Sequence, residues 1–301
     1  MRYSRKRVVI TGMGAITPLG ESVDEYWNSL VAGKSGIGPL TLVDASEFPS
    51  KIAGEVAGFD PVQYIEPRQA RRMARFSQMA VAASGIALED SGVNLSGEAS
   101  GRLGVVMGNG IGGFPTTEEN TRILVEKGGM KMSPHFISMI LPNMASANVS
   151  RIYGLKGYTS TIITACAAGN QAIGEAAVAL QRGVADLVVA GGCEAGICEI
   201  GLGGFNVIRA LSRHNEDPAG ASRPSRPRSL STGWADCMMD RASSLFANDS
   251  MYRAARSAVS HPSTTQPASD AAPRISRKSS SALSSASLLT TRARSSTDET
   301  S

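Results

Sequence analysis

Apolar positions between residues 7 and 220 follow two patterns, one typical of buried strands and one of helices. Short, nearly continuous apolar or β-branched runs predict strands at 8–11, 103–109, 158–164 and 186–192. Apolar residues at helical spacing, with start and stop signals, predict helices at 22–33, 67–92 and 169–182. Strands that alternate with helices are typical of an α/β protein with a largely parallel or mixed sheet.

Two of these helices carry distinctive local signals. In 22–33, Ser22 is a suitable N-cap, Glu25 follows three residues later, and Gly33 is a suitable stop. The helix at 169–182 has small residues along its middle, which are Ala172, Gly174, Ala176, Ala177 and Ala179. Such a thin helix is suited to packing between two layers, and we expect it to be covered on both sides.

The C-terminal part of the chain departs from this pattern. Residues 225–301 hold 20 serines but only one glycine, one valine and one isoleucine, which are Gly233, Val259 and Ile275. A stretch such as 278–287 cannot bury enough apolar surface to offset the entropy of ordering it. We therefore predict a tail without fixed structure, with at most a weak helix at 234–259.

Charge divides along the same boundary. Residues 1–224 hold 20 basic and 20 acidic residues, so the net charge of +4 lies in the tail. The arginines of the tail are scattered, and no basic-aromatic module accompanies them. Net charge therefore gives no support to nucleic-acid binding by the folded part.

Cysteine spacing and hydropathy exclude further classes. The four cysteines (Cys166, Cys193, Cys198 and Cys237) form no disulfide framework, and no second pair or nearby histidine completes a zinc site. The Gly-rich segments at 12–17 and 108–113 match neither a dinucleotide fingerprint nor a P-loop. No apolar run reaches the ~18 residues that a membrane helix needs. We expect a soluble cytoplasmic protein without metal or cofactor.

Cys166 is the candidate for chemistry, because it stands where a predicted strand meets a predicted helix. The positive end of a helix dipole lowers a thiol pKa and favours the thiolate. Backbone N–H groups in the same turn can stabilise an oxyanion. The neighbours Ala165, Ala167, Ala168 and Gly169 are small enough to leave room for a thioester. A nucleophile and a buried structural thiol both remain open on these grounds.

Six motifs occur in order and together resemble one family. They are V-V-I-T-G-M-G-A-I-T-P-L-G (8–20), G-N-G-I-G-G (108–113), S-P-H-F-I-S-M-I-L-P-N-M (133–144), T-A-C-A-A-G (164–169), G-G-C-E-A (191–195) and G-L-G-G-F-N-V-I-R-A-L-S (201–212). The resemblance is to the β-ketoacyl-[acyl-carrier-protein] synthases, in particular the elongating type II enzymes of bacterial fatty-acid synthesis. It covers about residue 5 to Pro224.

The resemblance implies a thiolase-like fold, in which two similar α/β halves stack as five layers, and a homodimer. It implies that Cys166 accepts an acyl chain from an acyl carrier protein as a thioester. Malonyl carrier protein would then lose CO2, and its carbanion would attack that thioester in a Claisen condensation. Ile111 and Phe205 align with positions that line the acyl pocket, although core packing is their simpler interpretation. Glu194 could anchor a turn or support the site, and the sequence assigns it no role.

The resemblance stops abruptly after Pro224. The family needs two histidines, in H-G-T and G-H-x-x-G-A motifs, together with a lysine and a gating phenylalanine. None of the three histidines here (His135, His214 and His261) fits, and the expected D-G-F-V-x-G-E-G motif is absent. We interpret residues 1–224 as the N-terminal half of the fold, with the C-terminal half missing or replaced. The tail at 225–301 is then either read from a displaced frame or a genuine disordered linker.

Four functional hypotheses remain. The chain is a condensing enzyme with Cys166 as nucleophile, impaired as written, or a non-catalytic partner subunit of a ketosynthase. Alternatively, it is an inactive fragment that does not fold stably. A cysteine hydrolase is the fourth hypothesis, and it requires His135 or His214 beside Cys166 as general base.

Overall fold

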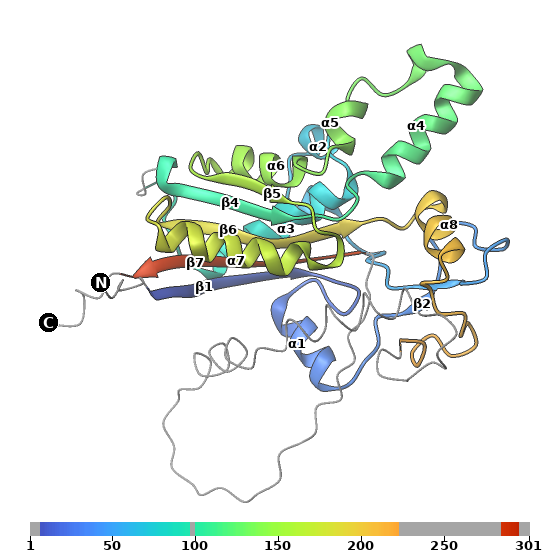
Figure 1. Ribbon diagram of the computed structural model, residues 1–301, viewed down its shortest axis with the longest axis horizontal. Helices are drawn as coiled ribbons and strands as arrows, with labels where there is room; N and C mark the ends of the chain where they lie inside the picture. Colours follow the sequence, from blue (N-terminus) through green and yellow to red (C-terminus); the bar gives the residue numbers. More distant parts are fainter. Residues whose placement is uncertain (1–6, 97–99, 223–283, 295–301) are drawn as a thin grey trace, which may run out of the picture. The chain divides into compact units, whose positions relative to one another are not determined.

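The computed structural model describes residues 7–96, 100–222 and 284–294, and within them one mixed sheet forms the centre of the fold (Figure 1). The sheet has the strand order β1-β7-β6-β4-β5. Its strands are β1 (Arg7–Ile16), β4 (Leu103–Gly108), β5 (Thr159–Ile162), β6 (Leu187–Ala195) and β7 (Ser284–Arg294). Strand β4 runs parallel to both β5 and β6, whereas β7 runs antiparallel to both β1 and β6.

Each face of the sheet buries a different set of side chains. Leu103, Val105 and Met107 belong to the core on the side of α3 (Arg75–Asp90), and Val106 belongs to the core on the side of α7 (Ala168–Gln181). Successive side chains of a strand point to opposite faces, so a strand buried on both faces reads as one continuous apolar run. Figure 1 shows α7 in front of the sheet and α3 behind it.

The thin helix α7 packs against the sheet through its smallest side chains. Ala172 and Ala176 are fully buried in this contact, together with Leu180. On the opposite side of the helix, Gly174 and Val178 are exposed in the part of the chain that the structure describes. The sheet thus supplies one of the two layers predicted for this helix, and the second layer stays a prediction.

The remaining described helices surround the sheet. They are α1 (Val23–Val31), α2 (Pro67–Ala70), α4 (Phe114–Lys127), α5 (Phe136–Ile140), α6 (Met144–Tyr153) and α8 (Glu199–Val207). Short strands β2 (Gly38–Pro39) and β3 (Ile52–Ala53) pair in a second sheet, and four 3-10 turns complete the list: η1 (Pro61–Gln63), η2 (Ser100–Arg102), η3 (Gly129–Lys131) and η4 (Ala165–Ala167). Helix α6 contacts α3, while α4 and α5 extend away from the sheet in Figure 1.

The predicted helix at 22–33 is confirmed with its caps. The hydroxyl of Ser22 accepts a hydrogen bond of 3.2 Å from the backbone N–H of Glu25. The carboxylate of Glu25 in turn accepts a bond of 3.0 Å from the backbone N–H of Glu21, just before the cap. Gly33 adopts φ +68°, a left-handed conformation that ends a helix at little cost in a glycine.

The prediction of one helix over 67–92 is wrong, because the structure divides it into α2 and α3. Glu66 caps α2 by accepting 2.9 Å bonds from the N–H groups of Arg68 and Gln69. Residues 71–74 form a turn, across which the side chain of Gln78 donates to the carbonyls of Ala70 and Met73. This side chain satisfies carbonyls that an unbroken helix would satisfy through its own backbone.

The expectation of a tail without fixed structure does not hold for Ser284–Arg294, which form β7. This strand lies between β1 and β6 and pairs with both along its length. The ladder bonds of a sheet come from the backbone, and strand edges without such partners are unfavourable. These backbone bonds do not depend on the composition of the tail, from which the absence of fixed structure was predicted. The weak helix expected at 234–259 lies outside the described residues.

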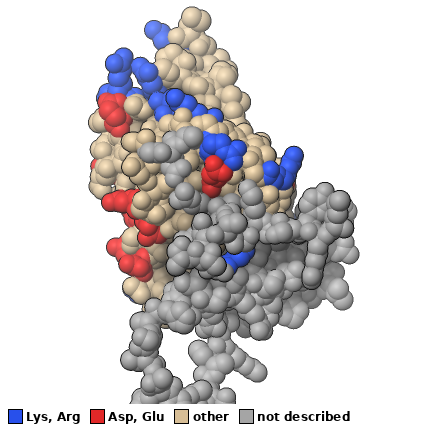
Figure 2. All heavy atoms as spheres, turned by 90° about the vertical axis from the view of Figure 1, so that its left-hand side faces the viewer, with Lys and Arg blue, Asp and Glu red and all other residues tan. Residues whose placement is uncertain are grey.

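Figure 2 views the side of the molecule from which β1, β4 and β6 start. Positive side chains gather in the upper part of the visible described surface, and negative ones lie along one side. Just before β4 and β6, Arg102 and Asp186 pair through hydrogen bonds of 2.9 and 2.7 Å. This mixed sign agrees with the charge balance of residues 1–224.

None of the helices formed by the described residues combines the length and the apolar character that crossing a membrane requires.

Candidate active site

Three loops meet at the carboxyl edge of the parallel strands. Gly108 of β4 pairs in register with Ile162 of β5 and with Gly192 of β6. The segments that follow these residues therefore leave the sheet at the same edge, on the side of α8 in Figure 1. Ligands of α/β proteins bind at such edges. Cys166 follows β5 here, the Gly-rich loop follows β4, and Glu194 lies at the end of β6.

Cys166 lies in η4, the short turn that leads directly into α7. The strand-to-helix position predicted for it is confirmed, and its side chain is exposed. The preceding residue, Ala165, has φ +50°, a left-handed conformation that residues with a Cβ rarely adopt. Strained backbone of this kind clusters at functional sites. In the described structure, the interpretation of Cys166 as a buried thiol is wrong.

Glycines let the start of α7 rest directly on the strands. A Cβ on Gly108 would overlap the backbone of Ala168, and a Cβ on Gly192 would lie 2.9 Å from the Cα of Gly169. Side chains at these positions would push the helix away from the sheet. The backbone of β4 and β6 therefore fixes the position of the turn that carries Cys166.

Two polar side chains hold the Gly-rich loop, 108–113, in place. Asn109 is buried, donates to the carbonyl of Cys193 at 2.6 Å and accepts from the N–H of Gly112 at 2.6 Å. One carboxylate oxygen of Glu194 accepts from the N–H groups of Gly110 and Ile111, at 2.9 and 3.1 Å. The loop is thus bonded to the end of β6 along most of its length.

The same loop borders the turn of the candidate nucleophile. The Cβ position of Gly110 lies 3.8 Å from the Cα of Ala165, the residue before Cys166. On its other side, a Cβ on Gly113 would lie 2.9 Å from the Cα of Ile140. The loop is therefore confined between η4 and α5.

Burial sets the acid–base state of the groups at the end of β6. It raises the pKa of Glu194, against the lowering effect of the N–H groups of Gly110, Ala195 and Ile111 and of the Asn109 side chain. Burial, followed by the nearby charge of Glu194, raises the pKa of Cys193 far above its usual range. Cys193 is therefore an unreactive, protonated thiol at neutral pH.

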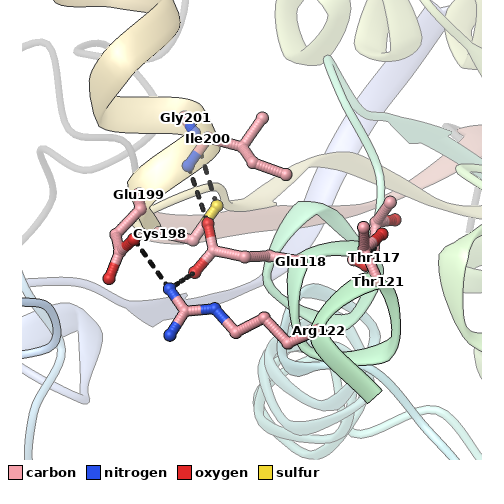
Figure 3. Close-up of polar contacts among 8 residues, drawn as sticks. All are labelled: Thr117, Glu118, Thr121, Arg122, Cys198, Glu199, Ile200 and Gly201. Atoms are coloured by element: carbon pink, nitrogen blue, oxygen red, sulfur yellow. Dashed lines mark hydrogen bonds and ion pairs between the residues drawn. The ribbon is translucent and has the colours of Figure 1, made fainter. Parts of the chain in front are cut away.

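A third cysteine, Cys198, caps helix α8 (Figure 3). Its sulfur accepts a 3.4 Å hydrogen bond from the N–H of Gly201. Burial of the side chain is the largest cause that raises its pKa, to about 11. Cys193 and Cys198 are therefore both buried thiols, while Cys237 lies outside the described residues.

Polar contacts from α4 fix the start of α8, as Figure 3 shows. The carboxylate of Glu118 accepts a 2.7 Å bond from the N–H of Ile200. Arg122 pairs with Glu199 at 2.7 Å and with Glu118 at 3.4 Å. Helix α8 carries Phe205, so these contacts also help to fix the backbone position of that residue.

The structure treats the two predicted pocket residues differently. It places Ile111 in the loop beside the Cys166 turn, and a Cβ on Gly196 would overlap the tip of the Ile111 side chain. Phe205 lies on α8 and is half-buried, and this position alone gives it no role in a pocket. Sequence reasoning gave no role to Asn109 or Glu194. The sequence signal for Glu194 was an acidic residue shortly after a predicted strand that ends in Gly191-Gly192, in a chain that also has a Gly-rich loop at 108–113.

The histidines give no support to a cysteine hydrolase. The Nδ1 atom of His214 lies 3.3 Å from a carboxylate oxygen of Glu216, within the loop that follows α8. His135 stands at the start of α5, and His261 lies outside the described residues. Among the described residues, no three or more His, Cys, Asp or Glu side chains form a group that could hold a metal ion.

An exposed cysteine thus lies in a strained turn at the start of a small-residue helix, which rests on the mixed sheet of an α/β protein. Residues 5–236 match the family described as "Beta-ketoacyl synthase, N-terminal domain". The chain belongs to the β-ketoacyl synthase family.

The curated relatives agree with this assignment. The chain is 44% identical over 220 residues to 3-oxoacyl-[acyl-carrier-protein] synthase 2 of Coxiella burnetii, covering 73% of this chain and 53% of that protein. It is 43% identical over 225 residues to the chloroplastic 3-oxoacyl-[acyl-carrier-protein] synthase I of Hordeum vulgare, covering 73% and 49%. The chain thus spans about half the length of the curated relatives that it matches.

Solved structures show the same fold. A β-ketoacyl synthase from Burkholderia phymatum is 27% identical with a TM-score of 0.68, over 96% of this chain and 59% of that one. The ishigamide ketosynthase/chain length factor is 30% identical with a TM-score of 0.66, over 69% of this chain and 52% of that one. The predicted thiolase-like fold is therefore confirmed.

Proposed function

We propose that this chain carries the acyl-accepting site of a β-ketoacyl-[acyl-carrier-protein] synthase of fatty-acid elongation, with Cys166 as its nucleophile. The observation that carries the proposal is the exposed position of Cys166 in a strained turn at the start of α7. Two further cysteines near the same edge are buried, and their raised pKa values make them unsuited to the role.

The first step is transfer of the acyl chain. The thiolate of Cys166 attacks the carbonyl carbon of an acyl carrier protein thioester, forming a new C–S bond. The carrier thiolate leaves with the electron pair of the broken C–S bond and takes up a proton from water. Backbone N–H groups at the start of α7 are suitably placed to stabilise the oxyanion, because helix N-termini present such donors.

The second step is the condensation. A malonyl carrier protein thioester loses CO2, and the resulting carbanion attacks the acyl thioester on Cys166. A carbon–carbon bond forms, and the Cys166 thiolate leaves with the electrons of its C–S bond. No metal or redox cofactor takes part in this balance. The family histidines that stabilise the carbanion have no counterpart in this sequence, so we expect acyl transfer to persist and condensation to be impaired.

The proposed partners follow from the site and from related proteins. The curated relatives are named for an acyl-carrier-protein substrate, and the solved complex AntDE:AntF joins a type II PKS acyl-carrier protein with its ketosynthase. For this chain we propose an acyl carrier protein as the donor, in the cytoplasm.

We also propose a homodimer, as the family resemblance implies. Strand β5 is the last strand of the described sheet, and Tyr158 and Ile163, which flank it, are 38% and 56% exposed. Edge strands with exposed apolar residues are suited to pairing with another chain.

A mass-spectrometric assay tests the nucleophile directly. The purified 301-residue chain is incubated with acyl carrier protein thioesters, and each cysteine peptide is examined for the added acyl mass. We expect the acyl group on the Cys166 peptide, its loss in Cys166→Ala, and its retention in the control Cys198→Ser. Acylation at another residue, or none in a chain that unfolds cooperatively, would overturn the proposal. An absent unfolding transition would instead support the inactive fragment.

A further inference from the structure

We propose that Glu194 is a positioning residue for the Cys166 nucleophile: its carboxylate holds the Gly-rich loop against Ala165 and so maintains the turn in which Cys166 is exposed. The proposal deepens the function given above and rests on it, because it concerns the same site. Glu194 acts through the backbone of the loop and takes no part in the transfer of the acyl group.

The turn before α7 has a conformation that its own residues do not favour. Ala165 has φ +50°, which a residue with a Cβ rarely adopts. Thr164, at the start of the turn, makes no side-chain hydrogen bond that would cap it. A strained conformation persists only where the surrounding structure imposes it. The neighbours of Ala165 therefore keep Cys166 in its exposed position.

Two glycines of the sheet support the far end of this segment. Gly108 approaches the backbone of Ala168 so closely that a Cβ would overlap it. Gly192 approaches Gly169 in the same way. Both glycines belong to strands that pair in register, so the sheet fixes their positions. These contacts secure the first residues of α7, but they do not reach Ala165.

Gly110 is the part of the loop that approaches Ala165. It lies beyond the end of β4, where the N–H of Asn109 still donates to the carbonyl of Ile162 at 3.0 Å. The N–H of Gly110 donates instead to the carboxylate of Glu194 at 2.9 Å. A Cβ on Gly110 would lie 2.8 Å from that carboxylate oxygen and 3.8 Å from the Cα of Ala165. The carboxylate and the turn thus border the same side of Gly110.

The carboxylate of Glu194 is itself held by several groups. The oxygen that accepts from Gly110 also accepts from the N–H of Ile111 at 3.1 Å, and the other oxygen accepts from the N–H of Ala195 at 3.2 Å. Asn109 separately bonds the loop to the end of β6. Removal of the carboxylate should therefore release the Gly110 part of the loop without detaching the whole loop from the sheet.

The test measures single-turnover acylation of Cys166 by octanoyl acyl carrier protein, using the full chain and a range of donor concentrations. In Glu194→Ala, we expect the maximal rate to fall about tenfold or more, since a small displacement of a reacting group costs up to about a hundredfold. The donor concentration that gives half the maximal rate should stay the same. Glu194→Gln retains an oxygen that can accept from the loop, and it should keep most of the rate.

The variant Ala165→Gly separates positioning from a general loss of stability. A glycine adopts the φ of +50° without the steric cost of a Cβ, so the turn no longer needs the loop to impose it. We expect Glu194→Ala combined with Ala165→Gly to recover most of the maximal rate. Such recovery is a coupling between the two sites.

Glu118→Ala is the matched control. Its carboxylate also accepts a backbone N–H, that of Ile200, but at the start of α8. Its removal should lower the stability of the chain and leave the acylation rate of Cys166 unchanged.

Alkylation of Cys166 by iodoacetamide, which needs no carrier protein, separates this inference from the proposed function. The alkylation rate should fall in Glu194→Ala and recover in the double variant with Ala165→Gly. If the wild-type chain is not acylated at Cys166, the proposed function is overturned, and the alkylation rates decide by themselves whether Glu194 holds the turn.

Two results overturn the inference alone. One is an acylated wild type whose rates are unchanged in Glu194→Ala. The other is a loss of rate in Glu194→Ala that Ala165→Gly does not recover. If Glu194→Ala does not fold, Glu194→Asp takes its place with the same expectations, because the shorter side chain withdraws the carboxylate from the loop.

Discussion

Two segments at the same edge of the sheet place a cysteine at the start of a helix, and they use it in opposite ways. In the β6–α8 segment, Cys198 is only 3% exposed, and its sulfur accepts a hydrogen bond from the first turn of α8. In the β5–α7 segment, Cys166 is exposed, and α7 begins after Ala167 without a side-chain cap.

The difference lies in which groups satisfy the N–H donors of the first turn. Helix α8 is served by the Cys198 sulfur and by the Glu118 carboxylate, both from the protein itself (Figure 3). The start of α7 has no side-chain cap, and its first N–H group, that of Ala168, donates to the carbonyl of Ala165 in the preceding turn. Surroundings, and not residue type, thus separate a structural thiol from one suited to acyl transfer.

The largest effect is expected where the Cys166 segment rests on the sheet. Gly108→Ala would place a Cβ against the backbone of Ala168, which cannot move as a side-chain end could. We expect the free energy of unfolding in urea to fall by about 3 kcal/mol or more. Gly174→Ala is the matched control, since nothing lies within 4 Å of its added Cβ, and up to ~1 kcal/mol of helix stabilisation is expected. An equal loss of unfolding free energy in Gly108→Ala and Gly174→Ala would contradict the close packing of Gly108 against α7.

Much of this segment could be predicted from the sequence, because its signals are local. The run 103–108 is buried on both faces, so its apolar residues are continuous. Small residues fill the helix that packs against it, and Cys166 stands at the junction. The caps of α1 are equally local, with Ser22 and Glu25 three residues apart.

The missed features depend on contacts between distant parts of the chain. Glu194 meets the Gly-rich loop only because Gly108 and Gly192 pair in register. The break between α2 and α3 depends on the Gln78 side chain, which bonds to carbonyls up to eight residues away. Strand β7 pairs through backbone groups that every sequence has. Neither apolar periodicity nor composition encodes these pairings.

The second prediction compares the reactivity of the thiols themselves. With iodoacetamide at about pH 8, Cys166 should react about a hundredfold faster than Cys198 or Cys193, since thiolate character and access control the rate. A pKa of about 11 leaves Cys198 only on the order of one part in a thousand ionised at that pH. Peptide mass spectrometry after timed quenching measures each site. In denaturant the rates should converge, and similar rates in the folded chain would remove the distinction between the two segments.

The third prediction concerns the anchor of the β6–α8 segment. Glu118→Ala removes the acceptor for the Ile200 N–H and one partner of Arg122, so we expect a loss of about 2 kcal/mol in urea unfolding. Glu118→Gln keeps an acceptor of the same length for that N–H and should lose less. A loss in Glu118→Gln as large as that in Glu118→Ala would show that the charge, and not the hydrogen bond, holds α8.

The smallest effect is expected in the alkaline stability of the same segment. The pKa of Cys198 is raised from 9.0 to about 11, chiefly by burial, so its protonated form is favoured in the folded state. The stability that this group contributes is full below pH 9 and is lost as the pH rises through 11. The hydroxyl introduced by Cys198→Ser would still accept the Gly201 N–H but would not ionise in this range.

Melting temperatures should therefore run parallel for wild type and Cys198→Ser between about pH 7 and 9, and the wild type should fall more steeply from there to pH 11. Parallel curves over the whole range would mean that the Cys198 sulfur ionises in the folded protein as it does in the unfolded chain. Burial would then protect this thiol only by blocking access, and the contrast with Cys166 would be one of exposure alone.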